Sequence, residues 1–378
     1  TLAGSVQASK GSAAAGAAIA VTTIVAPVKV VVDDSHLLAG NNVELEAKNL
    51  SVAAGVAVGG QGADKFAIGG SVAVNTLVST TEALIRNSST VHADGDVLLT
   101  AEDASYVGAL AGSVQIAKGT AAAGAAVSVN TLVNTVSTGI ASSTVSAGGQ
   151  VLLDSKNISI TANVAVGAQG ANSFALGGSV AVNTIVKTTQ AYTTGTVADP
   201  SSIAAWGDIS LKAEDLAIVV DAAGALQISK GAAAAGAAVT VNTVVDTVKT
   251  YSNHTTLQSG MLHVDPAAVI DATEKTIRFT SPHHLQDGDI VVYHKTGDGD
   301  IGLENGVEYT VLFNDPYNIQ LAPTGGGGAV PLTPPVGTAE HSLRKSSKRL
   351  DFDLSTVTVN DADNTLSFSN DHHFVQGE

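Results

Sequence analysis

The chain has 378 residues, of which 44% are hydrophobic but only 4% are aromatic, and it carries a formal net charge of −16. A core must therefore be built from Ala, Val, Ile, Leu and Thr, which argues against an ordinary globular enzyme with an aromatic-lined pocket. The acidic balance disfavours nucleic acid and anionic membrane surfaces, and the absence of Cys excludes disulfides and thiolate chemistry.

Near the N-terminus, residues 13–32 resemble a membrane span because Lys29 is their only charge. The same pattern returns downstream with Asn, Thr, Lys and Asp inside it, and such residues are costly in lipid. We therefore predict that the chain neither spans a membrane nor binds nucleic acid.

Internal repeats fill the first two thirds of the chain. Three of the four steps between recurring Gln residues are 54 residues long, and the last is 58. A Val-(Asn/Thr)-Thr step follows each Gln, and a Gly lies six residues before each Asn or Thr of that step. Because several independent positions keep one spacing, we expect five half-repeats of about 54 residues over positions 1–262.

Alternation within each half-repeat predicts strands rather than helices. Gly interrupts every Ala run, and residues 126–133 (Ala-Val-Ser-Val-Asn-Thr-Leu-Val) alternate with period two. Such units cannot bury a core alone and must stack on their neighbours. The sequence predicts an all-β fold: a β-solenoid with two or three coils per half-repeat, about a dozen coils forming a rod roughly 60 Å long. The alternative is a row of long β-hairpins with turns near residues 118–119 and 170–172.

The recurring amides have a structural interpretation in such a stack. Identical Asn or Gln side chains that lie above one another can hydrogen-bond along the stacking axis, whereas a ligand-binding role is the less favoured alternative. The predicted ladder residues are Gln7, Gln61, Gln115, Gln169, Gln227, Asn75, Asn130, Asn183 and Asn242.

The C-terminal third differs in composition, because most aromatic residues and eight of the ten His lie beyond residue 250. Short alternating runs at 290–293 and 309–313 predict a compact all-β module over residues 263–364. Residues 365–378 resemble residues 276–289 and are interpreted as the start of a second copy of this module. The pattern indicates an excerpt of a longer protein, or a piece that joins its neighbours end to end.

One acidic loop of this module is a candidate metal site. Asp298, Asp300 and Glu304 place three carboxylates within seven residues, and calcium prefers clustered oxygen ligands. The full EF-hand pattern is absent, so a solvated acidic turn is the favoured interpretation, and calcium is the one cofactor left open. The pairs His283-His284 and His372-His373 are poor chelators, since adjacent strand residues point to opposite faces.

The Val-Asn-Thr steps, the Ala/Gly runs and the Gly-Asp-Val-Leu-Leu element at 95–99 resemble repeats of giant bacterial surface and secreted proteins. These proteins include filamentous-haemagglutinin-like and autotransporter-type adhesins, and residues 285–293 resemble units interspersed in them. The resemblance implies an extracellular or cell-surface fibre whose partners are neighbouring repeats or copies joined end to end, together with host or cell-surface glycans.

We therefore expect a structural segment of a very large adhesin or surface filament, which builds an elongated rod for adhesion or matrix formation. No catalytic residue set or nucleotide-binding motif stands out from the repeats, so we expect no enzyme activity. The alternatives are a glycan- or calcium-binding module of a secreted protein and a carbohydrate-active β-helix enzyme.

Overall fold

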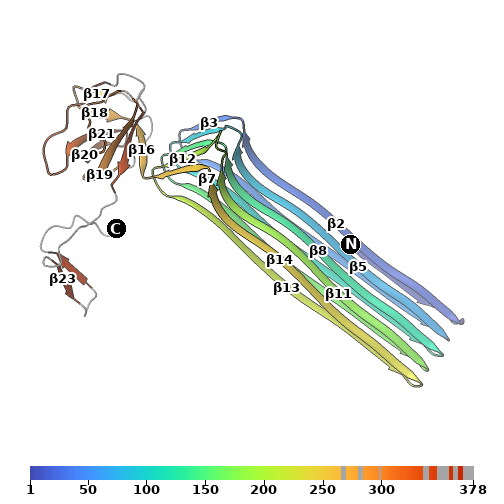
Figure 1. Cartoon of the computed structure of the whole chain (residues 1–378). Helices are drawn as coiled ribbons and strands as arrows, with labels where there is room; N and C mark the ends of the chain where they lie inside the picture. Colours follow the sequence, from blue (N-terminus) through green and yellow to red (C-terminus); the bar gives the residue numbers. More distant parts are fainter. Residues whose placement is uncertain are drawn as a thin grey trace. The chain divides into compact units, whose positions relative to one another are not determined.

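The computed structural model describes residues 1–264, 270–279, 283, 285–297, 299–334, 340–346, 357–360 and 365–368. These residues form strands and no helix, and the chain divides into two compact units, Thr1–Gly260 and Met261–Glu378. The predicted fold class, a repetitive β-solenoid followed by a separate small all-β module, is confirmed (Figure 1).

Unit 1 is a solenoid of three parallel sheets, and each coil contributes one strand to each sheet. Sheet A contains β1 (Leu2–Ala8), β4 (Val43–Ala63), β7 (Val97–Ala117), β10 (Val151–Ala171) and β13 (Ile209–Ser229). Sheet B contains β2 (Ala13–Asp33), β5 (Phe66–Arg86), β8 (Ala121–Ala141), β11 (Phe174–Thr194) and β14 (Ala233–Asn253). Sheet C contains the short strands β3 (His36–Ala39), β6 (Thr90–Ala93), β9 (Thr144–Ala147), β12 (Ser201–Ala205) and β15 (Thr255–Ser259).

Each half-repeat makes one coil, so the prediction of two or three coils per half-repeat is wrong. Val97 pairs in register with Val43 and with Val151, which lie 54 residues before and after it. Apart from the short β1, the strands of sheets A and B have 21 residues and are roughly 70 Å long. Five coils rather than a dozen therefore stack, over a height of roughly 20 Å.

The predicted turns connect different sheets and close no hairpin. Residues 118–120 join β7 of sheet A to β8 of sheet B, and residues 172–173 join β10 to β11 in the same way. The longer last step of the repeat comes from the loop at residues 195–200, which separates β11 from β12, where only residues 142–143 separate β8 from β9. The loop ends at Pro200, because Ser201 and Ser202 already belong to β12.

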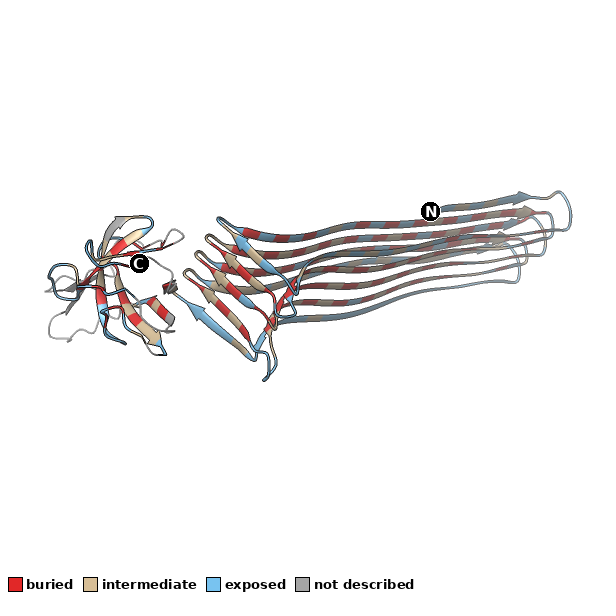
Figure 2. Ribbon diagram, turned by 90° about the horizontal axis from the view of Figure 1, so that it is seen from above, coloured by how far each residue is buried: buried red, intermediate tan, exposed pale blue. Residues whose placement is uncertain are grey.

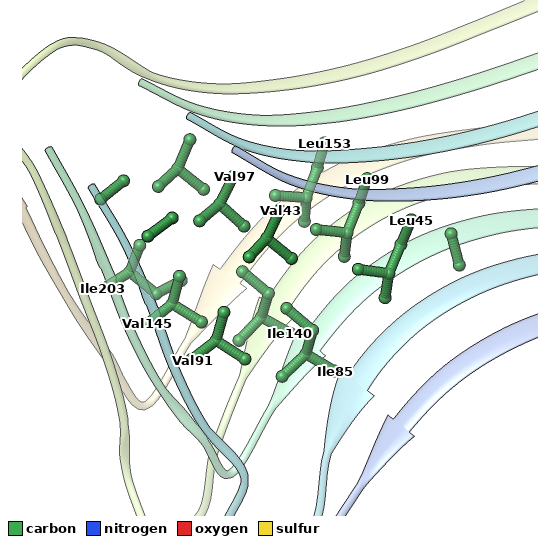
Figure 3. Packing of buried hydrophobic residues seen from close by; sticks show 14 of the residues in the cluster. Val43, Leu45, Ile85, Val91, Val97, Leu99, Ile140, Val145, Leu153 and Ile203 are labelled. Carbon is green, nitrogen blue, oxygen red and sulfur yellow. The ribbon is translucent and has the colours of Figure 1, made fainter. Parts of the chain in front are cut away.

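We call the end of unit 1 that sheet C closes the prism, and large aliphatic side chains fill it. Leu99 of sheet A, Ile140 of sheet B, and Val145 and Ile203 of sheet C are almost completely buried against one another (Figure 3). Burial of such a side chain contributes about 1.5–3 kcal/mol. The prism therefore holds the conventional hydrophobic core of the solenoid.

Beyond the prism, sheets A and B continue as a two-layer arm whose interior side chains are mostly small or polar. In the third coil, Ala111, Ser113 and Gln115 of β7 face Ala126 and neighbouring residues of β8, and all are buried. Figure 2 shows the alternation of buried and less buried residues along these strands. Most of the larger Val, Leu and Ile side chains in the arm point outward, which reverses the usual arrangement of a sandwich. The exception is one inward aliphatic layer, formed by Leu77, Leu132 and Ile185 with Val107 of the opposite sheet.

Unit 2 contains a seven-stranded antiparallel sheet in the order β16-β22-β19-β20-β21-β18-β17. Tyr293, Val311 and Leu343 lie in its core and are fully buried. The remaining described strands, β23 (Val357–Asn360) and β24 (Thr365–Phe368), form a separate pair. The bounds of the seven strands are β16 (Met261–Val264), β17 (Ile270–Asp271), β18 (Thr276–Arg278), β19 (Ile290–Thr296), β20 (Glu308–Asp315), β21 (Asn318–Pro323) and β22 (Glu340–Lys345).

Candidate functional site

The Gln residues that the spacing singled out lie above one another at the far end of the arm. Nε2 of Gln115 donates to Oε1 of Gln61 at 2.9 Å, Gln169 donates to Gln115 at 2.9 Å, and Gln227 donates to Gln169 at 2.8 Å. Gln7 is aligned with Gln61, whose own Nε2 has no hydrogen-bond partner. The Gln ladder therefore links four successive coils through buried or partly buried side chains.

A column of glycines on sheet B faces this ladder. A Cβ atom at Gly124 would overlap Oε1 of Gln115, and a Cβ atom at Gly177 would overlap Oε1 of Gln169 in the same way. Gly69 and Gly236 meet their own Gln residues identically. The recurring Gly is required because the side-chain amide of each Gln on sheet A lies directly on the backbone of sheet B.

The Asn residues form two separate pairs and no continuous ladder. Nδ2 of Asn75 donates to Oδ1 of Asn130 at 3.0 Å, and Nδ2 of Asn183 donates to Oδ1 of Asn242 at 3.1 Å. Between these pairs, Asn130 donates across the arm to the carbonyl oxygen of Ala162 at 3.0 Å. The Asn side chains therefore connect sheet B both to the next coil and to sheet A.

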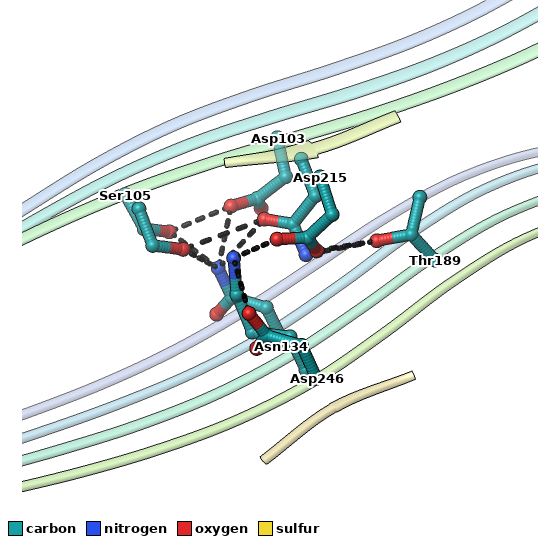
Figure 4. A network of polar contacts seen from close by, with 9 residues as sticks. Asp103, Ser105, Asn134, Thr189, Asp215 and Asp246 are labelled. Atoms are coloured by element: carbon teal, nitrogen blue, oxygen red, sulfur yellow. Dashed lines mark hydrogen bonds and ion pairs between the residues drawn. The ribbon is translucent and has the colours of Figure 1, made fainter. Parts of the chain in front are cut away.

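A third polar layer lies between the prism and the Asn pairs, and sequence reasoning missed it. It is centred on Asp103, which is completely buried and accepts only neutral donors (Figure 4). The donors are Asn49 at 2.6 Å, Ser79 at 2.7 Å, Thr81 at 3.3 Å, Ser105 at 2.6 Å and Asn134 at 2.8 Å. Five hydrogen bonds thus stabilise a carboxylate that no buried cation contacts in this part of the described structure.

In the fourth and fifth coils, the same layer contains a buried ion pair. Nζ of Lys187 contacts Oδ1 of Asp215 and lies 3.7 Å from Oδ2 of Asp246, and Thr189 donates to Asp215 at 2.9 Å. The side chain of Lys187 is 0% exposed and that of Asp215 is 4% exposed. The signal that could have revealed this layer is an Asn or Asp that recurs with the spacing of the Gln residues, at 49, 103, 157 and 215.

Two carboxylates of the polar layers have raised pKa values. Burial raises the pKa of Asp221, although hydrogen bonds from Asn183 and Asn242 oppose the shift. Burial likewise raises the pKa of Asp246, against the effect of the nearby Lys187 ammonium. Both carboxylates are therefore less stable in their charged form inside the fold than in water.

Asp221→Asn is expected to raise the melting temperature of unit 1 at pH 7 by about 1–3 °C. The pKa of Asp221 is higher in the folded chain than in the unfolded chain, where it is near 3.8. The stability of the wild type therefore rises as pH falls from 7 through the raised pKa. Asn occupies the aligned position 163 of the preceding coil. The substitution therefore keeps the size of the side chain and an oxygen that can accept the hydrogen bond from Asn183.

Thermal melts between about pH 4 and pH 7 check this expectation through the fluorescence of Trp206, the only Trp of the chain. The variant should show a smaller rise in melting temperature on acidification than the wild type. An equal or larger rise in the variant would contradict the assignment.

The acidic loop of unit 2 shows no completed metal site in the described residues. Oδ1 of Asp300 accepts the backbone N–H of Gly302 at 2.8 Å, and the backbone N–H of Glu304 donates to Oη of Tyr309 at 2.9 Å. Asp298 lies outside the described residues. Within the described ranges no three His, Asp or Glu side chains are grouped to hold a metal ion, and calcium binding by this loop stays a prediction.

His283 is buried in a loop of unit 2, where both ring nitrogens are used. Nε2 lies 2.7 Å from the carbonyl oxygen of Asp315, and Nδ1 accepts the backbone N–H of Leu285 at 3.0 Å. The ring therefore fixes the loop through backbone contacts. His284, His372 and His373 lie outside the described residues.

Comparison with known proteins adds no assignment, because no family model, no curated protein and no solved structure matches the chain. A search of the described residues for a helix long and apolar enough to cross a membrane found none. The most regular polar contacts of the solenoid thus connect like residues on successive coils.

Proposed function

We propose that unit 1 is a structural segment of a very large extracellular adhesin or surface filament, and that its partners are further coils of the same kind. The observation that carries the proposal is the stacking of like on like through five coils. Gln lies on Gln, and the facing column contains Gly in every coil. Such ladders favour stacking against a neighbour that has the same sequence and register.

The last coil presents an inner surface with core character. Val244 of β14 is 44% exposed, whereas the aligned residues Ile185 and Leu132 are fully buried. Leu257 of β15 is 41% exposed, whereas the aligned Ile203 is fully buried. A further coil would bury these residues as the earlier coils bury theirs.

The backbone of this coil also offers hydrogen-bonding groups. Among the described strands, β13, β14 and β15 each pair with one strand of the preceding coil and with no other. An unpaired parallel edge of 21 residues is a template for another strand. This edge and the exposed apolar residues favour growth of the stack along its axis.

The extracellular location is part of the proposal and rests on composition and resemblance. The chain contains no Cys and has a net charge of −16, and its repeats resemble those of giant surface and secreted proteins. Antibody labelling of intact source cells tests the location. Surface labelling is expected, and labelling that requires permeabilised cells would contradict it.

Val244→Lys is expected to weaken end-to-end association of the chain by about 100-fold or more, because a further coil would bury an unpaired ammonium in an aliphatic layer. Sedimentation velocity over a concentration series measures the association constant. Electron microscopy should show elongated stacks of the wild-type chain and single segments of the variant.

The matched control is Val245→Lys, which places the same charge on the outward side of the adjacent position, where Val245 is 51% exposed. This variant should associate end to end like the wild type. A wild-type chain that stays monomeric at all concentrations, or equal effects of the two substitutions, would overturn the stacking proposal.

A further inference from the structure

The outer face of sheet A carries no charged side chain along the arm. We call the outward side chains of residues 50–63, 104–117, 158–171 and 216–229 the arm face. The only charged residue in these ranges is Asp221, which points inward and hydrogen-bonds to Asn183. Towards the prism, by contrast, the same face bears Glu44, Glu46 and Lys48 on β4.

The arm face is larger than the apolar patches of ordinary monomers. Fourteen residues along four strands cover about 46 Å by 19 Å, or roughly 900 Å². The largest apolar patch of a typical monomer measures about 300–600 Å², and each partner of a stable complex buries about 800 Å². The arm face alone is therefore large enough to support a specific dimer.

Near the far end of the arm face, one column of residues alternates between large side chains and Gly with a period of two coils. Ile116 is 58% exposed, and its aligned neighbours on both sides are Gly62 and Gly170. Ile228, which is aligned with Gly170 on the other side, is 60% exposed. In this column, large side chains thus form ridges about 9.6 Å apart, and glycine hollows of the same spacing lie between them.

The hollows have no role inside the chain that the structure reveals. A Cβ atom at Gly108, Gly170 or Gly224 would meet no other atom within 4 Å. Gly weakens a strand because it loses more conformational freedom on folding and packs no side chain. These outward glycines therefore differ from Gly124 and Gly177, which make room for an inward Gln.

We propose that the arm face of one chain packs against the arm face of a second copy. Ile116 and Ile228 of each copy enter the hollows of the other, since ridges and hollows share one spacing and a shift of one coil brings them into register. A second copy is favoured over a lipid surface because the arm has open strand edges, whose unpaired backbone groups are costly in hydrocarbon. This lateral contact is independent of the proposed stacking along the axis.

The test uses the full chain carrying Val244→Lys, which separates lateral from end-to-end association. Sedimentation velocity should show a monomer–dimer equilibrium. Adding Gly170→Val fills a hollow and should weaken the dimer by about 100-fold, while the melting temperature stays equal or rises because the new side chain has open space and β-branched residues favour strands. Ile116→Lys should abolish the dimer, and Val129→Lys on the outer face of sheet B should leave it intact.

A monomer at all concentrations up to about 100 µM, or a Gly170→Val variant that dimerises like its parent, would overturn the proposal. Flotation of the same protein with phosphatidylcholine vesicles separates the lipid alternative. A chain that stays monomeric and floats with vesicles would assign the face to lipid and would also overturn the proposal. The stacking proposal is judged separately, from Val244→Lys against Val245→Lys.

Discussion

Gly177→Ala is expected to lower the free energy of unfolding of unit 1 by about 3–5 kcal/mol, although it adds a single methyl group. The new Cβ atom would overlap Oε1 of Gln169 and would lie 2.8 Å from Nε2 of Gln227. Gln169 must then move, which breaks its ladder hydrogen bonds to Gln115 and Gln227 and leaves buried amide groups without partners. Urea unfolding followed by the fluorescence of Trp206 measures the loss.

The adjacent substitution Gly178→Ala is the control for this prediction. Gly178 points outward, and its Cβ atom would make only an ordinary contact of 3.5 Å to the carbonyl oxygen of Ala237. Ala already occupies the aligned positions 125 and 237. The stability of Gly178→Ala should stay within about 0.5 kcal/mol of the wild type. Equal losses for the two variants would contradict the contact between the Gly column and the Gln ladder.

Lys187→Asn is expected to destabilise unit 1 by about 3–5 kcal/mol, because it leaves the carboxylate of Asp215 buried without its cation. The double variant Lys187→Asn, Asp215→Asn should recover stability to within about 1 kcal/mol of the wild type. It reproduces the arrangement one coil earlier, where Asn134 and Asn157 occupy the aligned positions.

The same urea unfolding experiment measures this recovery, and Lys212→Asn is the matched control. Lys212 lies on the outward side of β13 and is exposed, so its replacement should change stability by less than about 0.5 kcal/mol. A double variant that is no more stable than Lys187→Asn alone would show that the two charges do not compensate each other inside the arm.

The stacking of the half-repeats could be predicted because single residues that recur at a constant spacing fix their register. Gln61, Gln115 and Gln169 keep a spacing of 54 residues, and only a stack with that period brings them into hydrogen-bonding distance. The facing glycines keep the same spacing for a steric reason. The Gln ladder and its register therefore follow from the sequence once the period is known.

The length of a coil could not be predicted from the same spacing, because a period of 54 residues is compatible with one, two or three coils. Gly within an alternating run normally indicates a turn or a bulge. Gly108 and Gly124 instead lie inside continuous strands. Gly108 faces outward into open space, and Gly124 faces inward against the side chain of Gln115. Strands of 21 residues are far longer than the usual five or six, so the shorter coil was the natural expectation.

The sequence also could not predict which face of each strand points into the arm. Alternation separates two faces of a strand, but it does not say which face is buried when one carries Val and the other carries Asn or Ser. Over most of the arm, the close approach of sheets A and B selects the smaller side chains for the inside, where Ser128 and Asn130 are fully buried. The burial of Lys187 could not be predicted for the same reason, since only the opposite sheet supplies Asp215.

The central claim is that one coil contains one half-repeat, and a distance across the stack tests it most directly. The chain has no Cys, so Thr23→Cys and Thr243→Cys can be introduced and spin-labelled at two outward positions of one column. Four strand spacings separate them, which predicts a distance of about 19 Å between residues 220 positions apart in the sequence. A distribution centred at about 40 Å or beyond, as eight or more intervening coils would require, would contradict it.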